Sequence, residues 1–107
     1  MADTRSTSTA VMESTNDATG FVEIHQGQGL GAQIGGTNIT ATVQLQYRRD
    51  ANSPTSIVRT YTFAAVDGTA ETDFVSSVEG EYRLIATAFT SATNGTLALI
   101  PGAYMGR

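Results

Sequence analysis

The chain has 107 residues, enough for one domain, and a formal net charge of -4. All its basic residues are arginines without a clustered run, which argues against nucleic acid as a partner because phosphate neutralisation needs clustered Lys or Arg. Cysteine is absent, which excludes disulfides, thiol catalysis and cysteine-bound zinc. No apolar run reaches the ~18 residues of a transmembrane helix, and residues 1–20 lack the apolar core of a secretory signal. We therefore expect no membrane partner.

Residues 1–20 differ in composition from the remainder. Eight of the twenty are Ser or Thr, and the only clustered apolar residues are Ala10, Val11 and Met12. Such a segment buries too little surface to offset its ordering entropy. We predict a flexible arm over 1–20, followed by one domain over 21–107. The alternative is an arm that orders against a neighbouring subunit, with Val11 and Met12 as its anchor.

From residue 21 onward the chain is typical of strands and turns. The clearest strand is 37–47, where Ile39, Ala41, Val43, Leu45 and Tyr47 alternate with polar residues. The predicted strands are 21–25, 37–47, 57–65, 72–78, 81–90 and 96–100. The predicted turns are 48–56, 67–71, 79–80 and 91–95, with hairpins at Asp67-Gly68 and Asn94-Gly95.

No segment has a convincing helical period. The fold class predicted is all-β, an antiparallel β-sandwich or small barrel of six to seven strands with the flexible N-terminal arm. The strand 81–90 is apolar on both faces, since Tyr82 and Leu84 alternate with Ile85 and Phe89. We expect it to lie centrally, covered on both sides.

The glycine-rich stretch GQGLGAQIGGTN, residues 27–38, does not fit the patterns of phosphate-binding loops. The dinucleotide fingerprint fails because Ala32 and Ile34 stand where its last glycine is needed. The spacing from Gly31 to Gly36 fits a P-loop, but Thr37 occupies the lysine position, and a strand follows where a helix is required. We predict a mobile connection between strands that touches a neighbouring subunit, and no nucleotide cofactor.

The titratable residues do not form a recognisable site. Retroviral-type aspartic proteases use Asp-Thr/Ser-Gly, whereas residues 67–69 have the order Asp-Gly-Thr. Glu23 and His25 share a strand face but supply only two of the ligands that zinc needs. Glu79, Glu81 and Asp73 fall short of the six to eight oxygens of calcium. The sequence therefore predicts no catalytic residue, no cofactor and no metal.

Two arginines lie within predicted strands. Arg59 shares its face with Ile57, Tyr61 and Phe63, and Arg83 shares its face with Ile85. An arginine on an apolar face needs a partner. Either the guanidinium of Arg59 reaches the rim of the sheet, or it meets a carboxylate of a neighbouring subunit.

The runs TVQLQYRRD, TYTF and DFVSSVEGEYRLIATAFTSATNGTLAL, within residues 38–100, resemble a pattern of tailed-phage virion proteins. Gly80, Glu81, Tyr82, Arg83 and Leu84 match its G-E-Y-R-L strand. The resemblance implies a small β-sandwich with a structural role in the particle, either as capsid decoration or at a host-binding tip. It also implies trimers and a flexible N-terminal arm that contacts the shell. This likeness is one of fold.

We therefore expect a non-enzymatic capsid decoration (cement) protein on the virion surface. The expected partners are the major capsid protein or other virion proteins and further copies of this chain, with a trimer as the favoured homo-oligomer. The expected interface residues are Val11, Met12, Arg59, Arg83, Tyr104 and Met105. The alternative is a receptor- or glycan-binding module, which the absence of Trp disfavours. A small hydrolase would require a cleft with a perturbed titratable group.

Overall fold

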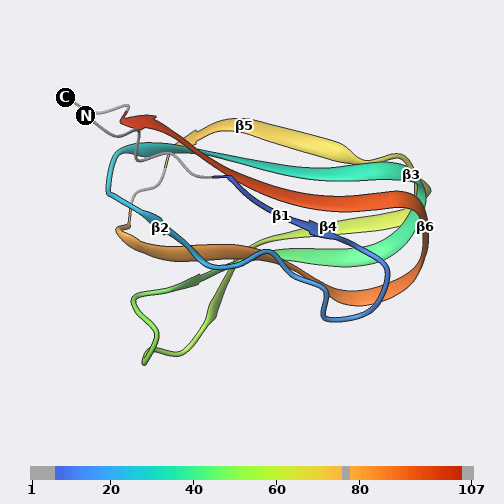
Figure 1. The fold of residues 1–107 in the computed structure, drawn as a ribbon, viewed down its shortest axis with the longest axis horizontal. Coiled ribbons are helices and arrows are strands. Elements are labelled where there is room, and N and C mark those ends of the chain that lie inside the picture. Colours follow the sequence, from blue (N-terminus) through green and yellow to red (C-terminus); the bar gives the residue numbers. More distant parts are fainter. Residues whose placement is uncertain (1–6, 76–77, 105–107) are drawn as a thin grey trace.

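The computed structural model of the protein describes residues 7–75 and 78–104, and the side chains of 7–70 and 78–102. Six strands form one antiparallel sheet, and no helix occurs in this part of the chain (Figure 1). The strands are β1 (Ser8–Val11), β2 (Val22–Ile24), β3 (Gln28–Arg48), β4 (Ser56–Val66), β5 (Thr69–Val75) and β6 (Gly80–Tyr104). The predicted all-β class is confirmed.

The sheet is built on two long strands that fold over together. β3 has 21 residues and β6 has 25, and the two pair from Gln28↔Tyr104 to Arg48↔Glu81. Figure 1 shows both strands turning back at the right-hand end of the view, so that each contributes to two facing layers. The first half of β3 lies in one layer with β1 and β5, and its second half lies in the other with β2 and β4.

The order of the strands within the two layers is informative. If the two halves of β3 and of β6 are counted separately, they make eight strand segments together with the four other strands. These segments are numbered 1 to 8 along the chain. The pairings give the order 1-8-3-6 in one layer and 2-7-4-5 in the other. This is the strand order of a jelly roll, in which two Greek keys cover a common core.

Glycines occupy the bend where the layers meet. Gly36 has a φ of 125°, which favours glycine, and its carbonyl accepts the Gly68 N–H at 3.0 Å. A Cβ on Gly68 would collide with the Ile34 carbonyl. On β6, Asn94 adopts a φ of 55° at the same bend. Glycine and asparagine thus allow strands to turn a corner and pack closely.

Three predictions fail at this corner. The stretch 27–38 is not a mobile connection, because residues 28–38 belong to β3. Asn94-Gly95 does not close a hairpin, because β6 continues from Gly80 to Tyr104. Asp67-Gly68 is not a hairpin turn, because β4 and β5 pair with different halves of β3 rather than with each other. In each case the sequence contains residues typical of turns, but in the structure they form the bend by which the chain passes from one layer to the other.

The segment predicted as a flexible arm is part of the sheet. β1 pairs with β6 from Ser8↔Leu99 to Val11↔Thr96. The N–H of Met12 then donates to the Gly95 carbonyl at 2.9 Å, and the Met12 side chain is only 1% exposed. The prediction of an arm is therefore wrong for residues 8–20, since their backbone follows the edge of β6. Residues 1–6 lie outside the described chain.

The core fills the space between the layers. The residues of β3 alternate as predicted, with Val43 and Leu45 fully buried. β6 is central, since it pairs with β1, β2 and β3, and Leu84 and Ile85 are 0% and 8% exposed on its opposite faces. The largest buried side chains are Met12, Ile24, Leu30, Ile34, Ile39, Leu45, Leu84, Leu97, Leu99 and Val43.

Candidate functional site

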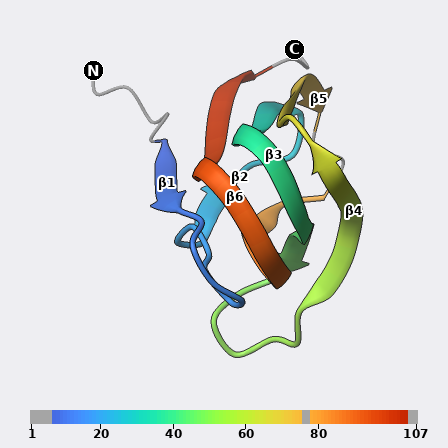
Figure 2. The same cartoon turned by 90° about the vertical axis from the view of Figure 1, so that its right-hand side faces the viewer.

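Three of the six exposed large hydrophobic residues of the described chain lie on β4, the last strand on one side of the sheet. Figure 2 shows β4 at the right-hand margin of the molecule, far from β1. Of its eleven residues only Phe63 is buried and Tyr61 half-buried. Ile57 is 60% exposed, Val58 39% and Val66 48%. A strand edge of this kind can bind an added strand through its backbone.

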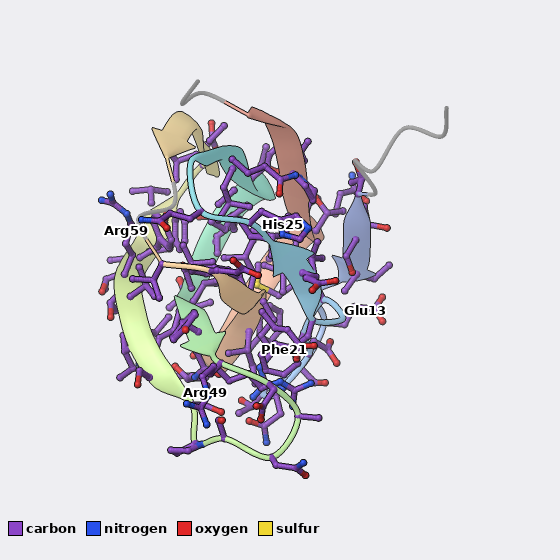
Figure 3. All side chains as sticks on the ribbon, turned by 90° about the vertical axis from the view of Figure 1, so that its left-hand side faces the viewer. Glu13, Phe21, His25, Arg49 and Arg59 are labelled. Atoms are coloured by element: carbon purple, nitrogen blue, oxygen red, sulfur yellow. The ribbon has the colours of Figure 1, made fainter. Side chains whose placement is uncertain are left out.

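The structure distributes the six predicted interface residues over different surroundings. Val11 is 59% exposed on β1, but Met12 is a core residue and offers no side chain to a neighbour. Arg59 is exposed on β4, at the side of the molecule opposite Glu13 (Figure 3). Tyr104 ends β6, but its side chain and the whole of Met105 lie outside the described part. The four whose side chains are described, Val11, Met12, Arg59 and Arg83, therefore do not form one site.

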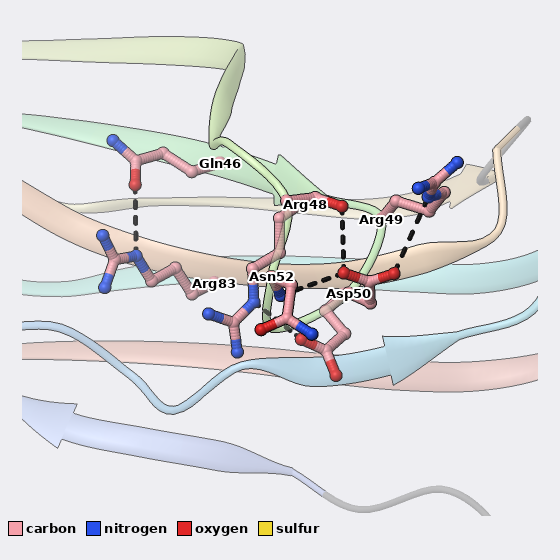
Figure 4. Close-up of polar contacts among 8 residues, drawn as sticks. Gln46, Arg48, Arg49, Asp50, Asn52 and Arg83 are labelled. Carbon is pink, nitrogen blue, oxygen red and sulfur yellow. Dashed lines mark hydrogen bonds and ion pairs between the residues drawn. The ribbon is translucent and has the colours of Figure 1, made fainter.

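Arg83 belongs to a cluster that the sequence did not reveal. Its Nε donates to Gln46 Oε1 at 3.1 Å (Figure 4), and its guanidinium carbon lies 4.7 Å from the centre of the Phe21 ring. Arg48 lies closer to the same ring, at 3.6 Å, and its Nε donates to Glu81 Oε1 at 2.7 Å. Two guanidinium groups thus share one aromatic ring, a cation–π arrangement. No spacing rule links Phe21 to residues 48 and 83.

A groove of about 500 Å³ lies at the bend of the sheet. Its lining combines apolar and polar side chains with backbone from β1, the segment after β1, and β6. The lining residues are Val11, Met12, Glu13, Phe89, Ser91, Ala92, Asn94, Gly95 and Thr96. The groove therefore exists only because the N-terminal segment is docked against β6, which the predicted free arm would not have allowed.

The acidic residues considered as metal ligands gather beside a smaller groove. This groove of about 370 Å³ is lined by Glu23, Arg49, Asp50, Glu79, Gly80 and Glu81. His25 lies just past β2, and its Nδ1 is 3.7 Å from Glu79 Oε2. Over the described residues, no group of three or more His, Asp or Glu side chains is placed to hold a metal ion. The side chain of Asp73 lies outside that part.

Two carboxyl groups in the described part of the chain, those of Asp17 and Asp50, have lowered pKa values. The N–H groups of Glu13 and Ser14 donate to Asp17 Oδ2 at 2.8 and 2.9 Å and lower the pKa of Asp17 from its ordinary value of 3.8. Hydrogen bonds from the Ser53 hydroxyl and the Asn52 N–H lower the pKa of Asp50 in the same way (Figure 4). Both carboxylates stabilise turns, which accounts for the direction of the shifts.

Asp67, the residue compared with a protease aspartate, has a structural contact. Its Oδ1 accepts the N–H of Asn38 at 3.3 Å across the bend. The exposed carboxylate therefore joins the β4–β5 corner to the corner of β3 and supports the fold at that point.

Comparisons with protein-family models, with curated protein sequences and with solved structures gave no match for this chain. Within the described residues, no helix is long and apolar enough to cross a membrane.

Proposed function

We propose that the protein is a non-enzymatic structural protein of a virion, a decoration protein that binds the outside of a capsid and stabilises it through contacts between subunits. The observation that carries this proposal is the strand order 1-8-3-6 and 2-7-4-5. Jelly rolls with this order are common among viral capsid domains. Fold alone does not specify function, so the support comes from the fold together with the sequence resemblance.

The exposed surface of β4 is compatible with such a role. A decoration protein acts by adhesion, and repeated copies on a symmetric shell add their weak contacts through avidity. Ile57, Val58 and Val66 present apolar area that contact with another protein would remove from water. Assembly as a homo-oligomer, with the trimer that the resemblance implies, belongs to the same proposal.

The test is the location of the protein in particles from the source of the sequence. Gold-labelled antibody raised against the purified protein should decorate the whole capsid surface in electron micrographs. Shells stripped of the protein should release DNA at a lower temperature, and adding the protein back should restore their resistance. Label confined to the tail, or particles without label, would overturn the proposal.

One observation favours a receptor- or glycan-binding module as the second candidate. Phe21, Arg48 and Arg83 form a partly exposed platform beside the amides of Gln44 and Gln46. Planar polar groups beside an aromatic ring suit sugar recognition, and lectin domains are among the jelly rolls. Label at the tail tip together with glycan binding that Arg83→Ala abolishes would favour this function over capsid decoration.

A further inference from the structure

We infer that β4 pairs edge to edge with β4 of a second copy of this chain, antiparallel and about a two-fold axis normal to the sheet. The inference deepens the proposed function, on which its role in a particle rests, by naming a partner for the exposed strand. Pairing itself is a property of the purified protein. It would extend the β2–β6–β3–β4 layer of one copy directly into that of the next.

The edge of β4 is long and regular. Residues 59–64 pair one for one with residues 45–40 of β3, and the register shifts lie on either side of this stretch. β3 is the only strand in the described chain to which β4 is paired. Six residues in register are as many as an average strand contains, so this stretch is long enough for a second strand to bind.

The usual protections of an edge strand are few in this stretch. Natural proteins guard such edges with charged side chains, lysine above all, and with proline, bulges or very short strands. Residues 59–64 contain neither proline nor lysine, and Arg59 is their only charged residue. The bulge near Val58 and the positive φ of Ala65 lie outside the stretch. A regular stretch with high β-propensity and a single charged residue favours pairing with another strand.

Strand length and the exposed apolar residues favour a second copy as the partner. The other strands on the margins of the sheet are shorter, with four residues in β1, three in β2 and seven in β5. β4 of another copy therefore offers the one edge of equal length among the described strands. With the two-fold axis at the centre of the stretch, antiparallel pairing also brings exposed Val58 alongside Ala64 or Val66 of the partner strand, so apolar side chains meet there.

The pleat of the sheet restricts the register. Opposed residues of an antiparallel pair must point to the same face of the sheet. The two-fold axis must therefore pass beside a residue that lies opposite its own copy. The two residues at the centre of the stretch 59–64 are Tyr61 and Thr62. In either register the two Arg59 residues are at least four positions apart, roughly 14 Å along the strands. This exceeds the screening length at physiological salt. Thr60 and Thr62 then oppose threonine or alanine of the partner strand.

The test is the mass of the purified protein in solution, measured by analytical ultracentrifugation from about 1 to 200 μM, a range that spans moderate self-association. We expect an even multiple of the monomer mass, a dimer alone or a hexamer if trimers are joined through β4. Thr62→Lys places like charges at the centre of the interface and should raise the dissociation constant about tenfold or more. Thr9→Lys, an exposed threonine on β1, should leave it unchanged.

Cross-linking supplies a second measurement that does not depend on the stability of the lysine variant. Because the chain has no cysteine, single-cysteine variants report one contact each. Residues that lie opposite each other have Cα atoms within disulfide range. If the axis lies beside Thr62, the Thr62→Cys variant by itself should form a disulfide-linked dimer. If the axis lies beside Tyr61, a disulfide should form only when Thr62→Cys is mixed with Thr60→Cys. Thr9→Cys should stay monomeric under the same oxidation.

Three results would overturn the inference: a wild-type protein that is monomeric or trimeric at every concentration, equal weakening by Thr62→Lys and Thr9→Lys, or no cross-link at positions 60 and 62. None of these results bears on whether antibody labels the capsid. Conversely, a dimer that is absent from particles would overturn the proposed function and leave the pairing of β4 standing.

Discussion

Replacing Met12 with alanine is expected to destabilise the fold by about 2–3 kcal/mol. The Met12 side chain is 1% exposed and belongs to the core cluster, and its N–H donates to the Gly95 carbonyl. The substitution keeps that backbone hydrogen bond and leaves a cavity in place of the thioether. We take the lower part of the usual range for buried methionine because the groove at the bend lets the site relax.

The control is Val11→Ala, since Val11 adjoins Met12 but is 59% exposed. Its expected cost is below about 0.5 kcal/mol. Urea unfolding followed by far-ultraviolet circular dichroism gives both values, and thermal unfolding should show a drop of roughly 10 °C for Met12→Ala alone. Equal stability of the two variants would refute the docking of residues 8–20 and restore the flexible arm.

Three further predictions concern single contacts. Gly36→Ala should cost about 1–3 kcal/mol, because φ is 125° and the new Cβ would lie 3.0 Å from the Thr93 carbonyl, while Gly20→Ala should be nearly neutral by the same unfolding assay. Arg48→Met should lower the free energy of unfolding by about 1 kcal/mol, because it removes a partly exposed ion pair, and by less in 1 M salt, which screens that pair. Arg49→Met changes a side chain that is 80% exposed and should have no measurable effect. The stability that Asp17 adds over Asp17→Asn should be complete above about pH 4 and disappear as the pH falls through its lowered pKa, measured by unfolding from pH 7 to pH 2.

Much of the fold followed from local patterns in the sequence. The alternation in residues 37–47 predicted the buried face of β3, and Val43 and Leu45 are fully buried. The turn chemistry of residues 48–56 predicted the loop between β3 and β4, which the pairing Tyr47↔Ser56 closes. The two apolar faces of residues 81–90 predicted a central strand. Each of these patterns involves only residues that are close in sequence, so it can be recognised without knowledge of the fold.

The corners could not be recognised in the same way. Asp67-Gly68 and Asn94-Gly95 indicate a reversal of the chain, because Gly and Asn tolerate positive φ. A strand that crosses from one layer to the other needs the same local geometry, but its partner remains the same strand on both sides of the bend. β6 pairs with β3 both before and after Asn94. The dipeptide therefore predicts the backbone conformation and not which strands it connects.

The candidate site was missed for a related reason. The sequence of β4 combines β-branched and aromatic residues in a way that suits a covered strand as well as an exposed one. Whether β4 is an edge depends on the return of β6 to the other side of β3, which occurs more than fourteen residues later in the chain and is set by long-range pairing. Arg59 does not distinguish these cases in the sequence, because one charged residue on an apolar strand face fits the rim of a sheet and a subunit interface equally well. The mass of the purified protein and the effect of Thr62→Lys decide between these two interpretations of the same strand, because only an interface makes β4 sensitive to a charge on its outer face.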